Sequence, residues 1–113
     1  MEQSLPMFAD AQALLAAASH NGPIWSSSSE QLNVNLIRLS GDAAIAAHIN
    51  AELDVMVVVV AGDGLVTLDD TARHVHTGDI VVIPRGARRA IANAGGVFVY
   101  VTCHRRRAAL MPA

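Results

Sequence analysis

Two histidines spaced two residues apart, His74 and His76, allow metal chemistry by their type and spacing. On a strand both would lie on one face, where two imidazoles could bind a transition metal. Val75 between them also fits a strand with one buried face whose histidines face solvent, and we favour this interpretation. His104, near the end of the last apolar run, is either a ligand or a partly exposed histidine bonded to the backbone, and we favour the second.

The remaining reactive residue types exclude several kinds of catalysis. All basic residues other than histidine are arginines, and the chain contains no lysine. Schiff-base chemistry, a lysine general base and pyridoxal-phosphate attachment are therefore excluded. Cys103 is the only cysteine, which excludes an intramolecular disulfide and a multi-cysteine zinc site. The segment Gly62-Asp63-Gly64 lacks the Lys and Ser/Thr of a phosphate loop and predicts a hairpin turn.

Charge is distributed unevenly along the chain. Residues 1–80 hold all ten carboxylates and two arginines, whereas residues 81–113 hold the other six arginines. We expect the two halves to pair within one fold. The run Arg105 to Arg107 is short and has no interleaved aromatic residue to stack bases, so we predict no nucleic-acid binding. The first residues lack a positively charged signal region, and the apolar run 55–61 is too short to span a bilayer, which favours a cytoplasmic protein with no membrane contact.

The length of 113 residues predicts a single domain over residues 1–113 that begins with one helix. Apolar residues recur at helical spacing from Phe8 to Ala18 and predict a helix over about 7–19, which would start near Ser4 and Pro6. Asn21-Gly22-Pro23 would end it. We interpret Ser26 to Ser29 as a polar loop and Trp25 as a cap over one end of the fold.

From residue 31 onward the hydrophobic period changes to two, and turn residues recur at intervals of about 8–12 residues. This pattern predicts an all-β antiparallel barrel over about 31–104, followed by a short C-terminal tail. Strands are expected near 32–37, 43–50, 54–60, 64–68, 71–76, 79–83, 88–93 and 97–104.

The strand from Val55 to Val60 is apolar on both faces, so neither face can be left to water. One face would fill the barrel, and the N-terminal helix or a second subunit would cover the other. We therefore predict a homodimer.

The turn residues and strand phases over residues 41–93 resemble the two sequence motifs of the cupin family. Gly41, His48-Ile49-Asn50, Asp54 and Gly62 are similar to the first motif, in which Gly is followed by H-x-H, Glu and Gly. The second motif, G-x5-P-x-G-x2-H-x3-N, resembles the segment from Gly78 to Asn93. The resemblance implies an antiparallel jelly-roll barrel, also called a double-stranded β-helix, and a homodimer.

The resemblance also implies where a metal would bind. In metal-bearing cupins two His and a Glu from the first motif and a His from the second hold one divalent ion. Those four positions are occupied here by His48, Asn50, Asp54 and Arg89. Arg89 offers no lone pair and would repel a cation, so we expect no metal cofactor. If a divalent metal does bind, we expect His48, Asp54 and His104 as its ligands.

Three classes of function stay open at this stage. We favour a metal-free barrel that binds a small polar or anionic ligand through His48, Asn50, Asp54 and Arg89. One alternative is an enzyme: a metal-dependent cupin of the isomerase or dioxygenase type with shifted ligands, or one that uses His48 as acid or base. Another is a structural or regulatory dimer with a vestigial pocket. The sequence identifies neither a substrate nor a catalytic residue, because cupin-like barrels support many activities.

A specific contact follows for the pocket. We expect the inward phase of the strand after Asp54 to include Met56 and Val58, so that the carboxylate points into the apolar barrel. An unpaired carboxylate there would be costly. Arg89 on the facing strand has the planar fork that meets a carboxylate. We therefore predict that a buried Arg89–Asp54 ion pair takes the place of the metal.

Overall fold

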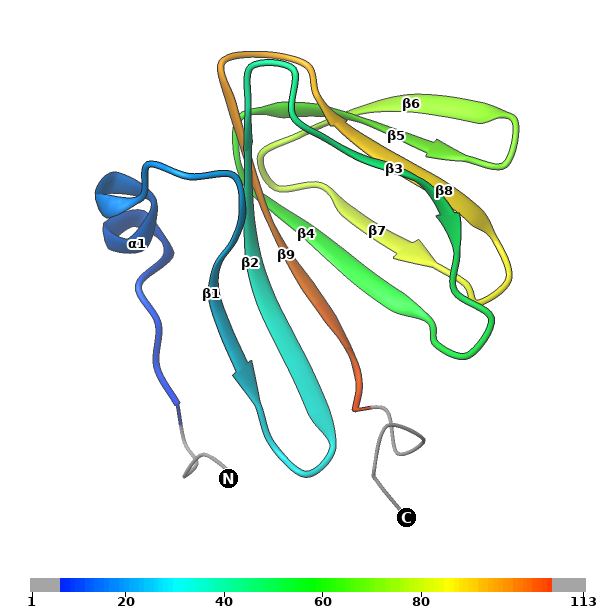
Figure 1. Cartoon of the computed structure of the whole chain (residues 1–113), viewed down its shortest axis with the longest axis horizontal. Coiled ribbons are helices and arrows are strands. Elements are labelled where there is room, and N and C mark those ends of the chain that lie inside the picture. Colours follow the sequence, from blue (N-terminus) through cyan, green and yellow to red (C-terminus); the bar gives the residue numbers. More distant parts are fainter. Residues whose placement is uncertain (1–6, 107–113) are drawn as a thin grey trace.

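Two antiparallel sheets face each other in the computed structural model, which describes residues 7–106 (Figure 1). One sheet has the strand order β1-β2-β9-β4-β7 and the other the order β3-β8-β5-β6. The predicted all-β antiparallel barrel with one short helix is confirmed. Its elements are α1 (Ala11–Ala17), β1 (Gly22–Ser28), β2 (Leu32–Ser40), β3 (Ala44–Ile49), β4 (Val55–Ala61), β5 (Asp63–Leu68), β6 (Thr71–His76), β7 (Ile80–Ile83), β8 (Arg88–Asn93) and β9 (Val97–Arg105).

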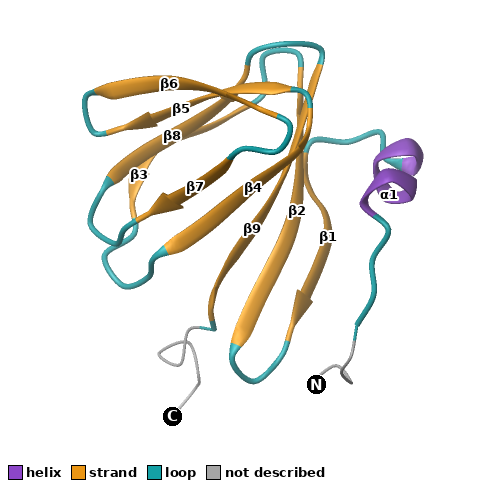
Figure 2. Cartoon of the chain, turned by 180° about the vertical axis from the view of Figure 1, so that it is seen from behind, coloured by secondary structure: helices purple, strands orange, loops and turns teal. Residues whose placement is uncertain are grey.

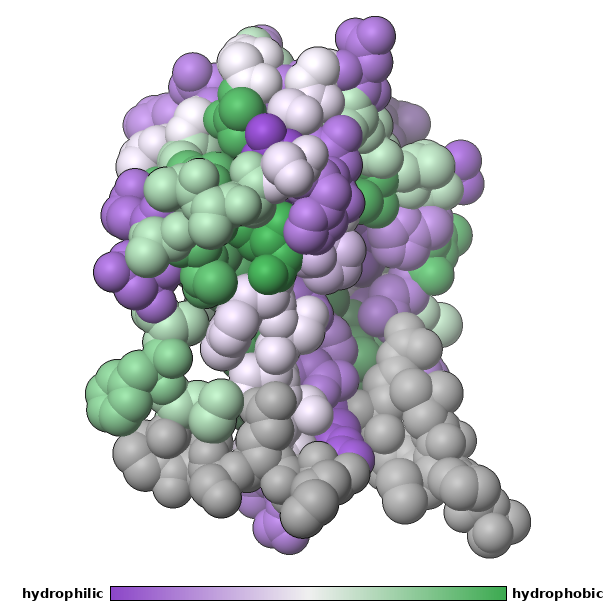
Figure 3. Space-filling view, turned by 60° about the vertical axis from the view of Figure 1, so that its left-hand side comes forward, coloured by the Kyte–Doolittle hydropathy of each residue, from purple (hydrophilic) through white to green (hydrophobic). Residues whose placement is uncertain are grey.

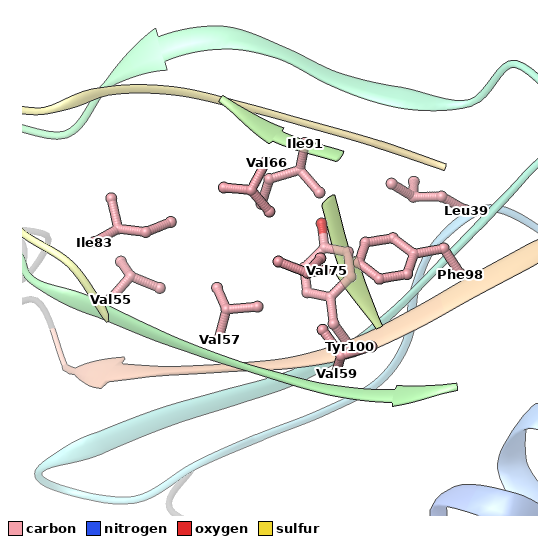
Figure 4. Packing of buried hydrophobic residues seen from close by; sticks show 10 residues of the cluster. All are labelled: Leu39, Val55, Val57, Val59, Val66, Val75, Ile83, Ile91, Phe98 and Tyr100. Atoms are coloured by element: carbon pink, nitrogen blue, oxygen red, sulfur yellow. The ribbon is translucent and has the colours of Figure 1, made fainter. Parts of the chain in front are cut away.

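The core fills the space between the sheets with alternate residues of most of the strands (Figure 4). β4 contributes Val55, Val57 and Val59, and β9 contributes Phe98 and Tyr100, whose ring centroids are 5.1 Å apart. Opposite them lie apolar residues of the second sheet, including Val66, Val75 and Ile91. The period of two that predicted the strands therefore also determines which residues enter the core.

The expected inward phase of β4 is wrong by one residue. Val55, Val57 and Val59 are buried, whereas Met56 is 41% exposed. The outer face of this strand therefore carries Met56 and Val58. Because both faces of β4 are apolar, hydrophobic alternation gave no information on which set points inward. The phase was decided by how β4 pairs with β9 and β7.

The expected polar loop at Ser26 to Ser29 is also wrong for most of its length, because residues 22–28 form strand β1. This strand pairs with β2, and Trp25 lies opposite Leu36 in that ladder rather than in a capping loop. The Ser26 hydroxyl donates to the Asn35 side chain, 2.6 Å away. Serine has little preference for strands, so the ladder offered by β2 overrides local propensity here.

Helix α1 is shorter than the expected range of about 7–19. Asp10 caps it by accepting a hydrogen bond from the Ala13 backbone N–H at 3.1 Å, and the Ala18 N–H bonds to the Leu15 carbonyl where the helix ends. Three predicted features lie outside the described residues: the helix start near Ser4 and Pro6, the end of the arginine run at Arg107, and the C-terminal tail. The helix begins at Asp10 because its side chain satisfies a first-turn backbone N–H, which apolar spacing does not report.

α1 lies beside β1, at the edge of its sheet, and does not cover β4 (Figure 2). None of its residues is buried. In the space-filling view that brings the α1 side forward, hydrophobic side chains gather at the surface (Figure 3). The expected covering of the outer face of β4 by this helix is therefore wrong.

No helix within residues 7–106 is long and apolar enough to cross a membrane.

Candidate functional site

The paired strands β3 and β8 bring two of the sequence-predicted pocket residues together. His48 lies opposite Arg89 in this ladder, and Leu68 of β5 lies opposite Arg89 on its other side. Directly paired residues share a face of the sheet, and Leu68 packs against the core. His48 and Arg89 therefore lie on the inner face of the sheet, one row beyond the core residues Val66 and Ile91.

Arg89 is a charged residue that the fold removes almost completely from water. Its side chain is 4% exposed, and this burial lowers the pKa of the guanidinium from its usual value. Nε donates to the Ala87 carbonyl at 3.1 Å and Nη2 donates to the Pro84 carbonyl at 3.4 Å. Within residues 7–106 no carboxylate forms an ion pair with it. The expected inward orientation of Arg89 is confirmed, but its acceptors are backbone carbonyls.

The predicted Arg89–Asp54 ion pair is wrong. Asp54 is exposed, and its Oδ1 accepts a hydrogen bond from the Arg85 backbone N–H at 2.8 Å. The physical reason is the phase of β4: Asp54 has the same parity as the outward Met56, so its carboxylate cannot enter the barrel. It ties the start of β4 to the turn between β7 and β8.

Asn50 likewise stabilises backbone rather than contributing to a pocket. Its Oδ1 accepts from the N–H groups of Glu52 and Leu53, at 3.0 and 3.1 Å, as in an Asx turn. Its carbonyl oxygen accepts from the Gly86 N–H at 2.8 Å. The loop 50–54 and the turn 84–86 are thus joined by both Asn50 and Asp54. Of the four predicted pocket residues, only His48 and Arg89 lie side by side.

His48 is exposed beside the buried Arg89. Its Nδ1 lies 2.9 Å from the Ala46 carbonyl oxygen, an arrangement in which Nδ1 carries the proton and donates it. The Nε2 atom is then the ring nitrogen that can meet a ligand, as an acceptor when the imidazole is neutral and as a donor when it is protonated.

The alternative metal ligands His48, Asp54 and His104 are not brought together. Residues 7–106 contain no group of three or more His, Cys, Asp or Glu side chains that could hold a metal ion. His104 lies in the other sheet, opposite Asn33, and its Nδ1 is 2.8 Å from the Arg105 carbonyl oxygen. The family's metal position does not fit this chain either, because Arg89 offers no lone pair and Asp54 faces outward.

The histidine pair on β6 lies where the favoured interpretation placed it. His74 and His76 are exposed on either side of the buried Val75. His76 Nδ1 is 3.2 Å from Asp79 Oδ2, and the His76 N–H donates to the same carboxylate at 2.8 Å. These contacts fasten the turn between β6 and β7.

Sequence reasoning missed Arg73. It is two residues before the buried Val75, so it lies on the inner face of its sheet, opposite Val66. A charged residue in the apolar phase of a strand was the available signal.

The fold and the residue pattern agree with known proteins. The family model described as the cupin domain matches residues 35–103, more than half of the chain. This chain belongs to the cupin-domain family. Its departures from the family's metal-binding pattern, at Asn50, Asp54 and Arg89, are therefore departures within a recognised cupin.

Solved structures share the cupin fold at low sequence identity. KdgF from Halomonas sp. is 18% identical over 77% of this chain and 81% of its own, with a TM-score of 0.69. An uncharacterized protein with a double-stranded beta-helix domain from Klebsiella pneumoniae is 17% identical over 89% of this chain and 90% of its own, with a TM-score of 0.73. A Bacillus halodurans protein is 18% identical over 96% of this chain and 85% of its own, with a TM-score of 0.78. No significant match was found among curated proteins.

Proposed function

We propose that this cupin-domain protein binds a small organic anion without a metal, with Arg89 and His48 as the residues that contact it. The carrying observation is the buried Arg89 guanidinium, which has no carboxylate partner within residues 7–106. A cation held away from water is stabilised by an anion, and a ligand carboxylate would supply one.

The hydrogen bonds of Arg89 support a carboxylate as the ligand group. Its Nε and Nη2 atoms donate to the Ala87 and Pro84 carbonyls, and the guanidinium carries further N–H donors. The two carbonyls fix the plane of the fork, which favours recognition of a planar anion. Nε2 of His48, which lies beside Arg89, would add a second polar contact to the ligand.

The experiment is calorimetric titration of the metal-free protein with acetate, succinate and inorganic phosphate. We expect saturable binding of at least one carboxylate and at least about tenfold weaker binding to Arg89→Met, because a charge-assisted hydrogen bond is lost. The matched control is Arg88→Met, which removes an exposed arginine on the same strand, opposite Ile49. Circular dichroism verifies that each variant is folded.

Two results would reject the proposal. One is the absence of saturable binding for all three anions. The other is equal affinity of wild type and folded Arg89→Met, since the guanidinium would then have only a structural role.

We also propose that two copies of the chain associate through the outer face of the sheet that contains β4 and β7. Met56 lies opposite Val82 and Val58 opposite Ile80, so four apolar side chains share this face. Ile80 and Val82 are 66% and 62% exposed. Exposed apolar patches of this kind are typical of protein interfaces, and a two-fold axis would pair the same patch on both copies.

A further inference from the structure

β6 and β7 diverge into different sheets (Figure 1). A cleft lies between them. Their connecting turn is fastened to β4, because the Gly78 N–H donates to the Val59 carbonyl at 2.9 Å and the Val59 N–H donates to the Asp79 carbonyl at 3.0 Å. Beyond this turn the two strands are not hydrogen-bonded to each other. The cleft between them has a volume of about 490 Å³, within the range of small-molecule sites.

The walls of the cleft are mainly aliphatic. Val66, Leu68 and Val75 line it from one sheet and Val81 lines it from the other. Val66 and Val75 belong to the buried core, so the apolar floor of the cleft is continuous with the barrel interior. An aliphatic chain placed here would remove apolar surface from water on both sides.

Arg73 gives this apolar cleft a positive charge. It lies opposite Val66 in the phase of the buried Val75 and lines the cleft, with its side chain exposed at the cleft surface. Asp79 is the one acidic residue of the lining, and its Oδ2 accepts a hydrogen bond from the His76 backbone N–H at 2.8 Å. No ion pair of Arg73 with a carboxylate exists within residues 7–106. The cleft thus combines aliphatic walls with the positively charged Arg73, and the described residues provide no ion-pair partner for it.

We infer that this cleft is a second ligand site, which binds an organic anion with an aliphatic body, such as a medium-chain carboxylate. The carboxylate meets the fork of Arg73, and the chain lies along Val66, Leu68, Val75 and Val81. The site is distinct from the Arg89 site, because neither Arg89 nor His48 lines the cleft. It goes beyond the proposed ligand site at Arg89 and does not depend on it.

The experiment titrates ¹⁵N-labelled full-length protein with decanoate, below its micelle concentration, and follows the amide resonances. We expect saturable shifts centred on Val66, Val75 and Val81. Hexanoate should bind at least about tenfold more weakly, because it buries fewer methylenes. Decanol should bind more weakly than decanoate, because it lacks the charge.

Matched variants assign the charge. Arg73→Met should weaken decanoate binding about tenfold and Arg73→Lys less, whereas the exposed Arg88→Met should leave it unchanged. Loss of decanoate binding in Arg89→Met but not in Arg73→Met would overturn the inference and leave the Arg89 site intact. Shifts centred on Met56 and Val58, or no saturation, would overturn it as well. Equal binding to Arg73→Met and wild type would also overturn it, and would show that the stem of Arg73 only covers Val66 while its charge stays in water.

Discussion

Arg89 and Asp54 occupy two positions of the cupin motifs, yet they are separated by the orientation of a single strand. Asp54 points outward and caps the Arg85 backbone N–H, while Arg89 points inward to the Pro84 and Ala87 carbonyls. Both side chains therefore stabilise the turn between β7 and β8, from opposite faces. In addition to this structural role, Arg89 places a positive charge on the inner face of the sheet, beside His48.

The role of Asp54 predicts a difference between two substitutions. Asp54→Asn keeps an oxygen that can accept from the Arg85 N–H and should leave the free energy of unfolding close to wild type. Asp54→Ala removes the acceptor and should cost about 1 kcal/mol. Urea unfolding measures both, with Asp70→Asn on the exposed β5–β6 turn as the control. A cost of about 3–5 kcal/mol for Asp54→Asn would indicate the buried ion pair after all.

Tyr100, the only tyrosine of the chain, predicts a loss of stability at high pH. Its burial raises the pKa of the phenol above the usual value of about 10. Above about pH 10 the unfolded chain releases this proton while the folded chain keeps it, so the folded state is progressively destabilised. Thermal unfolding of wild type and Tyr100→Phe over this range tests the prediction. The melting temperature of wild type should fall more steeply, and parallel curves for the two proteins would contradict it.

The hairpin between β4 and β5 depends on glycines at its closest approach to β9. A Cβ at Gly62 would collide with the Val97 carbonyl, and Gly62 has a φ of +78° that favours glycine. A Cβ at Gly64 would collide with the ring of Phe98. The turn chemistry that the sequence displays is therefore also a packing requirement of the barrel.

Gly64→Ala should accordingly destabilise the fold by about 1–3 kcal/mol, because the core has no room for a methyl group there. Gly96→Ala is the matched control, since a Cβ at that position meets open space and should change stability by less than about 0.5 kcal/mol. Combining Gly64→Ala with Phe98→Leu should cost less than the sum of the two single changes. A strictly additive result in chemical denaturation would show that Phe98 is not the obstacle.

At the scale of the whole molecule, the apolar outer face of β4 and β7 leads us to expect a homodimer. We predict a mass of about twice 11.9 kDa in light scattering at micromolar concentration. Ile80→Asp combined with Val82→Asp should give a folded monomer, because both side chains are exposed in the single chain. Ile49→Asp, at a residue that is 55% exposed on β3 of the other sheet, should stay dimeric. A monomeric wild type would reject the proposed association.

Local patterns were sufficient for the strands from 32 to 104 and for the turns between them. Alternation reports which residues are apolar at a period of two, and Gly, Asp and Pro report where the chain reverses, so both signals depend only on near neighbours. The resemblance to the cupin motifs, and not the local pattern, implied that His48 and Arg89 share one site, and in the structure they lie opposite each other on β3 and β8.

Only the tertiary structure decided the features that depend on a distant partner. β4 is apolar on both faces, so its pairing with β9 and β7 determined that Val57 enters the core and Asp54 stays outside. The serine-rich β1 became a strand because β2 offered it a ladder, which no local propensity encodes. Arg73 lines a cleft only because β6 and β7 belong to separate sheets. A side chain's type is local, whereas its surroundings are determined by segments far away in the sequence.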